Sequence, residues 1–343
     1  MLFEELKRRK IPKLLSREEM LEILQREEYG YIPDKPQNIR WEIDESYVIS
    51  NFCAGKATVQ KIYAVCTIDG KEFSFPFYCT IPTKCGKYPF FIHINFRDDV
   101  PDRYMPTEEL IDNGFAVLSF CYKDVTADND DFTDGLAGIL YEEGKRKQSD
   151  AGKIAMWAWA AQRVMDYAET KSSVLDTDCA IVCGHSRLGK TALLTAATDE
   201  RFKFAYSNDS GCSGAAITRG KQGENVKYIC ETLGYWFCEN YKKYIENERN
   251  MPFDQHYLLA AISPRYVCVG SASEDLWADP FSEQLCCLAA SDAFKNGFVS
   301  NGKHALVGDC FFEGDIGYHL RRGKHYFSRE DWNKLICFIN KHR

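Results

Sequence analysis

A serine between two glycines, at the junction of an apolar run and a small-residue stretch, is the clearest chemical signal in the sequence. Ser186 follows the apolar residues 180–183, with Gly184 two positions before it and Gly189 three positions after it. A sharp strand-to-helix turn of this kind pushes a hydroxyl into a cleft, beside backbone N–H groups and the positive end of a helix. The pattern predicts a nucleophile elbow at Ser186. Taken alone, it also fits a glycine-lined turn with a capping serine.

A serine nucleophile needs an imidazole to move its proton and a carboxylate to orient that imidazole. His325 follows the predicted strand 316–321 on a glycine-containing loop, whereas His319 lies inside that strand and should pack within the sheet. We therefore predict His325 as the base. Two acids, Asp209 and Asp275, each follow a predicted strand, and either could serve the imidazole.

The elements that must position these residues can be read from hydrophobic patterning. Continuous apolar runs at 88–95 and 114–121 are typical of strands covered on both faces of a parallel sheet. The runs 58–67 and 72–81 alternate, and the Asp69-Gly70 pair between them predicts an antiparallel hairpin. Residues 151–170 carry the apolar stripe of a helix.

The order of these elements indicates the fold class. A strand leading to serine and a helix, then a strand leading to aspartate, then a strand leading to histidine and a terminal helix is the chain order of α/β-hydrolases. We predict an α/β fold of this type, with a mostly parallel central sheet, an antiparallel N-terminal edge and helices on both faces. Residues 1–56 are expected to form a helical arm and lead-in, and residues 57–343 the catalytic domain, with an insertion at about 212–256.

Composition and charge limit the kinds of partner and the cellular location that can be expected. The chain has 343 residues and a net charge of −7, and its longest basic run is Lys7–Lys10, which argues against nucleic acid as a partner. No apolar segment suits a membrane or a signal peptide, so a cytoplasmic location is expected, or secretion if a leader has been removed. Most of the fifteen cysteines lie in apolar runs, as free thiols in a reducing compartment do.

Neither a metal nor a cofactor is expected. No Cys/His pair recurs at ligand spacing, and Cys286 and Cys287 are adjacent and far from any second pair. The acidic stretch 128–131 could suggest calcium, but Phe132 occupies the next ligand position of an alternating-oxygen loop. A solvated acidic loop is the better interpretation of this stretch.

The sequence resembles the glucuronoyl esterases of carbohydrate esterase family 15 and their bacterial relatives. The resemblance lies in Gly184-His-Ser-Arg-Leu-Gly-Lys190, close to the family's Gly-Cys-Ser-Arg-x-Gly-Lys, and in Glu274-Asp-Leu-Trp-Ala-Asp-Pro280. Further matching segments run from about residue 86 to the C-terminus: 207–216, 223–225, 251–256, 263–265 and 318–325. The resemblance implies a serine esterase that hydrolyses the ester on a 4-O-methyl-glucuronate side chain of xylan, the bond that ties xylan to lignin alcohols.

The resemblance also implies roles for individual residues. Arg187, with backbone N–H groups, would hold the oxyanion. Lys190 and Glu224 would bind the ring hydroxyls of the uronate, and Trp277 would lie against a sugar face. Each also has an ordinary structural interpretation, as a helix surface charge, a loop charge and a core aromatic residue.

Two departures from the family pattern bear on the site. Fungal members flank the catalytic serine and histidine with cysteines that form a disulfide, whereas those places hold His185 and Tyr326 here. Many members carry a catalytic glutamate where this chain has Asp209, which is one methylene shorter. We therefore expect Asp275, at the more usual α/β-hydrolase position, to be the principal acid, with Asp209 as a partial or backup partner.

Two other functions remain open at this point. An acetylxylan esterase or another carbohydrate deacetylase would share the serine, histidine and aspartate but favour small acetyl groups. A non-catalytic carbohydrate-binding relative would bind such sugars without turnover. In each case we expect a carbohydrate partner, and neither nucleic acid nor a membrane.

Overall fold

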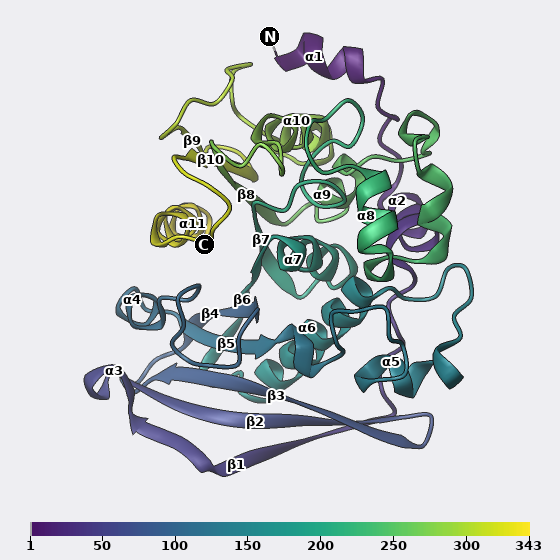
Figure 1. Cartoon of the computed structure of the whole chain (residues 1–343). Helices are drawn as coiled ribbons and strands as arrows, with labels where there is room; N and C mark the ends of the chain where they lie inside the picture. Colours follow the sequence, from purple (N-terminus) through teal and green to yellow (C-terminus); the bar gives the residue numbers. More distant parts are fainter. Residues whose placement is uncertain (1) are drawn as a thin grey trace.

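The computed structural model describes residues 2–343. Their fold is built around one ten-stranded sheet (Figure 1). The strand order is β1-β2-β3-β5-β4-β6-β7-β8-β10-β9. Six neighbouring strands are parallel, and they form the centre of the sheet: β5 (Ala116–Cys121), β4 (Tyr88–Asn95), β6 (Leu175–His185), β7 (Phe202–Asn208), β8 (Tyr266–Ala272) and β10 (Ile316–Arg321). The short strand β9 (Cys310–Phe311) closes one edge in the antiparallel sense.

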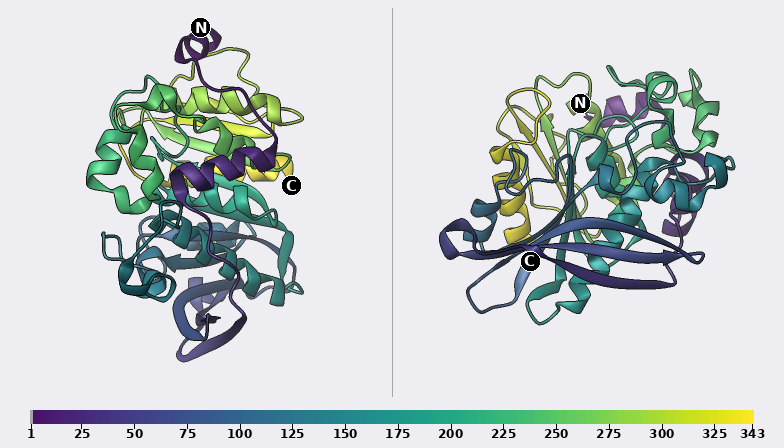
Figure 2. Two further views of the ribbon diagram at one scale, coloured as in Figure 1. Left: turned by 90° about the vertical axis from the view of Figure 1, so that its right-hand side faces the viewer. Right: turned by 60° about the horizontal axis from the view of Figure 1, so that its bottom comes forward.

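The other edge is an antiparallel ribbon. β1 (Asn38–Asn51), β2 (Ala57–Ile68) and β3 (Lys71–Pro82) pair in sequence, and the turn between Ile68 and Lys71 is the hairpin predicted at Asp69-Gly70. Figure 2 shows this long ribbon projecting along one side of the molecule. The predicted fold class is confirmed: the sheet is mostly parallel, has an antiparallel N-terminal edge and carries helices on both faces.

The sheet begins earlier than the expected boundary at residue 56. Residues 38–43 and 48–49 of β1 pair with β2, so the lead-in contributes an edge strand to the sheet. None of the side chains of β1 is fully buried, because the strand lies at the edge of the sheet. Its first half alternates apolar Ile39, Trp41 and Ile43 with polar residues, and Ile39 and Trp41 pack partly buried against the core, as expected of an edge strand that is covered, in part, on one face only.

Helices cover both faces of the parallel strands (Figure 1). On one face lie α4 (Thr107–Asp112) and α11 (Arg329–His342), whose Trp332 and Phe338 join a buried cluster with Phe91, Ile181 and Phe204. On the other face lie α6 (Lys153–Thr170), α7 (Arg187–Thr198), α9 (His256–Ala260) and α10 (Pro280–Ala290). Because successive strand residues point to opposite faces, two-sided cover explains the continuous apolar runs.

The N-terminal arm crosses the second face. It consists of α1 (Leu2–Arg9), α2 (Arg17–Leu24) and η1 (Gln25–Tyr29), and Ser16 forms a capping box with Glu19. The left view of Figure 2 shows the arm lying over the helical layer. Tyr257 in α9 anchors it by donating to the carbonyl of Lys13 at 2.6 Å.

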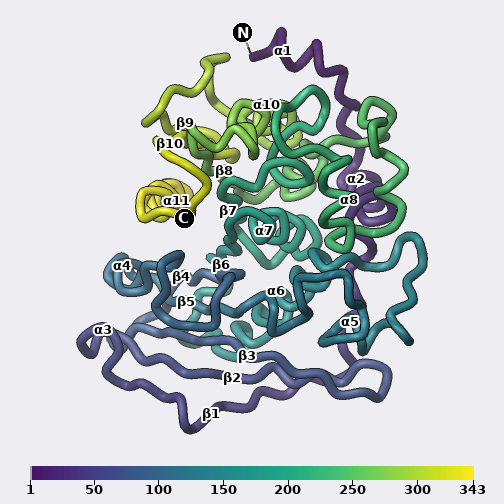
Figure 3. The backbone as a smooth tube through the Cα atoms, in the orientation of Figure 1, coloured from purple at the N-terminus to yellow at the C-terminus, as the bar shows by residue number. Residues whose placement is uncertain are grey.

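A run of short helices lies between β7 and β8, where the sequence predicts an insertion. It contains α8 (Val226–Thr232), η4 (Gly234–Trp236), η5 (Glu239–Tyr244) and η6 (Glu248–Asn250). Figure 3 shows this run beside the N-terminal arm, to which the Cys238 amide is bonded through the carbonyl of Glu28 at 2.9 Å.

The remaining short elements are α3 (Phe52–Gly55), η2 (Tyr122–Asp124), α5 (Gly135–Leu140), η3 (Glu142–Gly144) and η7 (Ser291–Ala293). Among residues 2–343, no helix is both long and apolar enough to cross a membrane.

Candidate active site

Ser186 stands at the turn between β6 and α7, in a backbone conformation that few residues with a side chain adopt. Its φ is 57° and its ψ is −126°. The Ser186 amide donates to the carbonyl of Asn208 at 2.8 Å, and the Ser186 carbonyl accepts from the amide of Gly189 at 2.9 Å. Such strain costs on the order of 1–3 kcal/mol and persists where the surroundings impose it. The turn has the geometry of a nucleophile elbow.

The two glycines that identified the elbow allow α7 to return closely to the sheet. A Cβ atom on Gly184 would lie 2.2 Å from the carbonyl oxygen of Leu188. A Cβ atom on Gly189 would lie 2.8 Å from the hydroxyl of Ser207 in the neighbouring strand β7. Both positions therefore exclude larger side chains for reasons of packing.

His325 lies on the loop after β10 and contacts Asp275, which follows β8. The His325 Nδ1 atom is 2.6 Å from Asp275 Oδ2. A carboxylate only accepts hydrogen bonds, so this contact places the proton of the neutral imidazole on Nδ1 and leaves Nε2 as the acceptor. Asp275 is itself fixed, because its Oδ1 accepts from the amide of Ala278 at 3.2 Å.

The ring of His185 links His325 to the elbow. The two imidazole centroids are 4.4 Å apart, and His185 immediately precedes Ser186. Its Nδ1 lies 2.7 Å from Asn208 Oδ1. Burial lowers the pKa of His185 well below its usual value, and the neighbouring His325 adds to the shift. His185 is therefore a neutral packing partner of His325.

Tyr104 connects the two positions at which the fungal pattern has cysteines. Its ring stacks on His185 at a centroid distance of 5.9 Å and contacts Tyr326 at 5.5 Å. An aromatic group thus spans the interval between the serine turn and the histidine loop. All fifteen cysteines are free thiols.

Asp209 reaches the same region but has a different partner. Ligand atoms of Asp209, Asp275 and His325 all lie within 4.8 Å of one another. Asp209 Oδ2 accepts from Arg321 Nη2 at 3.2 Å, whereas its Oδ1 is buried without a hydrogen-bond partner. Within this group His325 bonds to Asp275, and Asp209 bonds to Arg321.

Two further buried carboxyls, those of Glu283 and Asp331, lie close to Asp209. Burial raises the pKa of Asp209 well above its usual range, and the neighbouring carboxyls of Glu283 and Asp331 add to this shift while Arg321 opposes it. Burial likewise raises the pKa of Glu283 to about 7. Glu283 accepts from the amide of Gly211 at 2.9 Å and from the hydroxyl of Ser271, so it joins the two loops that carry Asp209 and Asp275.

Arg187, the first residue of α7, is held by an ion pair and an aromatic ring. Its guanidinium pairs with Asp128 and lies 4.6 Å from the ring centroid of Trp236. Asp128 also accepts from Trp236 Nε1 and Tyr122 Oη, each at 2.8 Å. The Nε atom of Arg187 is buried and has no hydrogen-bond partner.

The solvated loop expected at 128–131 is therefore wrong for Asp128, whose side chain is only 8% exposed. Apart from Tyr122, its partners come from two distant segments, around Arg187 and Trp236, and sequence spacing does not reveal them.

Lys190, Glu224 and Trp277, which are expected to bind substrate, lie near one another in the structure. Lys190 is buried in α7, where its Nζ donates to the Ser210 carbonyl at 2.6 Å and to Glu224 Oε2 at 3.2 Å. The Glu224 amide donates to the carbonyl of Trp277 at 3.0 Å. Trp277 is 48% exposed and packs edge-on against Tyr228. A buried ion pair and an exposed indole thus share one rim of the site.

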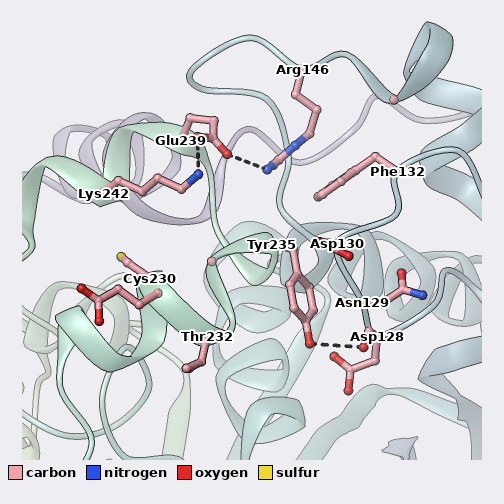
Figure 4. A pocket seen from close by; sticks show the side chains of 13 residues that line it. Asp128, Asn129, Asp130, Phe132, Arg146, Cys230, Thr232, Tyr235, Glu239 and Lys242 are labelled. Atoms are coloured by element: carbon pink, nitrogen blue, oxygen red, sulfur yellow. Dashed lines mark hydrogen bonds and ion pairs between the residues drawn. The ribbon is translucent and has the colours of Figure 1, made fainter.

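A cavity of about 600 Å³ adjoins Asp128 (Figure 4). Tyr235 lines it and donates from its hydroxyl to the Asp128 carbonyl at 3.2 Å. The two cations in its wall, Arg146 and Lys242, both pair with Glu239, at 3.2 and 2.6 Å. The cavity therefore suits neutral hydroxyl groups better than a further anion.

The comparisons with known proteins agree on one family. Residues 65–297 match the family model described as glucuronyl esterase, fungi. The chain is 37% identical over 240 residues to carbohydrate esterase MZ0003 from an unknown prokaryotic organism, a match that covers 68% of this chain and 55% of that protein. It is 28% identical over 331 residues to the 4-O-methyl-glucuronoyl methylesterase of Hypocrea jecorina, covering 94% of this chain and 64% of that protein. The chain thus spans somewhat more than half the length of these curated relatives.

Solved structures extend the similarity over nearly the whole chain. A glucuronoyl esterase from Solibacter usitatus superposes with a TM-score of 0.86 at 29% identity, covering 94% of this chain and 91% of that one. A promiscuous CE15 esterase from a marine bacterial metagenome superposes with a TM-score of 0.84 at 28% identity, covering 95% and 91%. The predicted resemblance is confirmed, and this chain belongs to the glucuronyl esterase family.

Proposed function

We propose that this protein is a serine ester hydrolase that cleaves esters of 4-O-methyl-glucuronate carried on xylan fragments. The observation that carries the proposal is the 2.6 Å contact between His325 and Asp275, with the His325 ring against His185, next to the strained turn of Ser186. A nucleophile, a base and an orienting acid are the three parts that acyl transfer to a serine requires. Family membership supports the choice of a uronate ester.

In this mechanism Ser186 attacks the ester carbonyl while His325 Nε2 takes its proton. Asp275 accepts the hydrogen bond from the Nδ1–H group and stabilises the imidazolium that forms. The imidazolium then protonates the leaving alcohol, which departs and leaves the uronate acylated on Ser186. Water, activated by the neutral imidazole, attacks the acyl group and releases the uronic acid and free Ser186.

Arg187 and the first amides of α7 would stabilise the oxyanion. Amides in the first turn of a helix have no partner within the helix, and Arg187 Nε is a charged donor without a partner. Removing one oxyanion donor costs roughly 3–4 kcal/mol in other serine hydrolases. Asp128 fixes the guanidinium in place from behind.

Lys190, Glu224 and Trp277 would bind the uronate ring. The ammonium donates and the carboxylate accepts, so the pair can serve two neighbouring hydroxyls, while the exposed indole can cover an apolar sugar face. The cavity beside Asp128 and Tyr235 would take neutral sugar units next to the uronate.

Rates on two substrates test this function against a deacetylase. We expect kcat/KM on a benzyl or methyl ester of glucuronate to exceed that on p-nitrophenyl acetate, and acetylated xylan to be a poor substrate. A preference for acetyl esters would favour the deacetylase. Binding of xylo-oligosaccharides without turnover of any ester would favour a carbohydrate-binding protein.

A further inference from the structure

The loop that carries His325 is built around one buried side chain. Arg321 ends β10, and the residue is only 4% exposed. Its Nη1 donates to the carbonyl of Arg322 at 3.1 Å. Its Nη2 donates to the carbonyls of Lys324, at 3.1 Å, and of Tyr326. These last two carbonyls belong to the residues on either side of His325, so the guanidinium binds the backbone that carries the imidazole.

Two carboxyls hold the guanidinium from the other side. Asp331 Oδ2, at the N-terminus of α11, accepts from Arg321 Nε at 2.6 Å. Asp209 Oδ2, at the end of β7, accepts from Nη2 at 3.2 Å. Asp331 also forms the capping box of α11 with Ser328. One side chain therefore connects β7, the His325 loop and the start of α11.

The other hydrogen bonds of the loop lie at Gly323, whose carbonyl accepts from the Glu274 amide at 2.8 Å, and at the Tyr326 side chain, whose hydroxyl donates to the Arg103 carbonyl at 3.0 Å. Residues 322 and 324–326 are exposed, and the side chain of His325 is itself 42% exposed. Exposed segments with few buried contacts are the ones that open most readily. A displacement of about 1 Å at a reacting group can cost on the order of 100-fold in rate. Among the described residues, Arg321 alone donates to the two carbonyls that flank His325, so the position of the imidazole depends on this side chain.

We propose that Arg321 is a positioning residue, which holds the 322–326 loop so that His325 meets Asp275, and that Asp209 acts on catalysis through Arg321. The inference rests on the proposed function of His325 as the base. A lysine cannot replace this arginine, since the planar guanidinium has five donors in a fixed fork, while an ammonium has three on a flexible stem. Asp209 and Asp331 supply the counter-charge that a buried cation needs.

Arg321→Lys tests the proposal because it keeps the positive charge and removes the fork. We expect kcat on a glucuronate ester to fall roughly 10- to 100-fold with KM nearly unchanged, as expected for loss of alignment at the reacting groups. The low-field proton NMR resonance of the His325 Nδ1–H, assigned by its loss in His325→Ala, should broaden or disappear. Arg329→Lys, on the exposed start of α11, is the matched control and should change neither.

Unchanged kcat and an intact resonance in folded Arg321→Lys would overturn the proposal. A loss of kcat that equals the loss of folded protein, measured by circular dichroism, would also overturn it. If Arg321→Lys does not fold, Asp209→Asn takes its place: kcat should fall only a few-fold and the resonance should broaden. A loss as large as that of Asp275→Asn would instead make Asp209 the direct acid.

The resonance separates this proposal from the substrate assignment. A wild-type protein that shows the resonance but does not hydrolyse uronate esters contradicts the proposed function. The response of the resonance to Arg321→Lys still decides whether Arg321 positions His325.

Discussion

His325 Nδ1 lies 2.6 Å from Asp275 Oδ2, and no such bond joins His325 to Asp209 among residues 2–343. Asp209 instead faces Arg321, and burial raises the pKa of its carboxyl well above the usual range. The Asp209 carboxyl is thus held by the guanidinium of Arg321, whereas the Asp275 carboxyl is held against the imidazole. The two acids at this edge of the sheet therefore have different partners, and we predict different effects on catalysis.

Asp275→Asn should reduce kcat by roughly 10²- to 10⁴-fold, because the amide no longer stabilises the imidazolium and can favour the wrong tautomer. Asp209→Asn should cost only a few-fold, and the double variant should lose less than the product of the two, since both act on one imidazole. Steady-state rates on a glucuronate ester measure this.

Glu274→Gln is the control for these variants, because Glu274 is adjacent to Asp275 but exposed, and its activity should be unchanged. If Asp209→Asn is as inactive as the double variant while Asp275→Asn is nearly normal, the assignment of the two acids is reversed.

How far the site could be predicted depends on the kind of contact. Ser186 and His325 could be placed from the sequence because glycine spacing and strand order are local signals. The contacts of Arg321 are mainly with backbone carbonyls, which every residue has, so no pattern of side chains indicates them. The one available signal was a charged residue at the end of a buried strand.

The same distinction applies to the fold. The buried parallel strands have continuous apolar sequences that predict them. The edge strand β1 (38–51) has no such run, because neither of its faces is fully covered. The burial of Asp128 could not be predicted, because its partners Arg187 and Trp236 lie 59 and 108 residues away in the sequence. The division into an arm at 1–56 and a catalytic domain at 57–343 remains a prediction.

Lys190→Ala should raise KM for glucuronate esters far more than for p-nitrophenyl acetate. The ammonium is buried against Glu224 and the Ser210 carbonyl, so its removal leaves a carboxylate without its partner where the sugar ring is proposed to bind. Trp277→Ala should have the same selectivity with less effect on stability, because the indole is 48% exposed.

Michaelis–Menten kinetics on both substrates separate binding from structure in these variants. Equal losses on the two esters would assign Lys190 and Trp277 a structural role only.

Gly184→Ala should unfold or severely destabilise the elbow, because the new methyl group would lie 2.2 Å from the Leu188 carbonyl. Gly234→Ala is a suitable control, since the nearest atom to its Cβ is 3.6 Å away on a flexible lysine side chain. Thermal midpoints of both variants measure the difference. A stable and active Gly184→Ala protein is incompatible with the elbow as described.

The buried carboxyl of Glu28 predicts how the stability of the folded protein depends on pH. Burial raises the pKa of Glu28 from 4.5 to about 8, against the opposing hydrogen bonds from Gln255. The folded state therefore holds this proton more tightly than the unfolded state. The stability it contributes is fully present below about pH 4.5 and is lost as the pH rises through about 8.

Wild-type protein should lose more unfolding free energy than Glu28→Gln between about pH 5 and about pH 8.5, by up to a few kcal/mol at about 1.4 kcal/mol per pKa unit. Urea unfolding at several pH values measures this. Glu45→Gln, at an exposed position of β1, should behave as wild type. Parallel curves for wild type and Glu28→Gln would mean that Glu28 is ionised in the folded state.

Hydrolysis of a benzyl or methyl ester of 4-O-methyl-glucuronate by wild type and by Ser186→Ala, at equal concentrations of folded protein, tests the central claim most directly. The wild type should release the free uronic acid with kcat/KM above that for p-nitrophenyl acetate. Ser186→Ala should keep the circular dichroism spectrum of the wild type and lose turnover, since only the nucleophilic hydroxyl is removed. Absence of uronate ester hydrolysis by the wild type, or full activity in Ser186→Ala, would contradict the account.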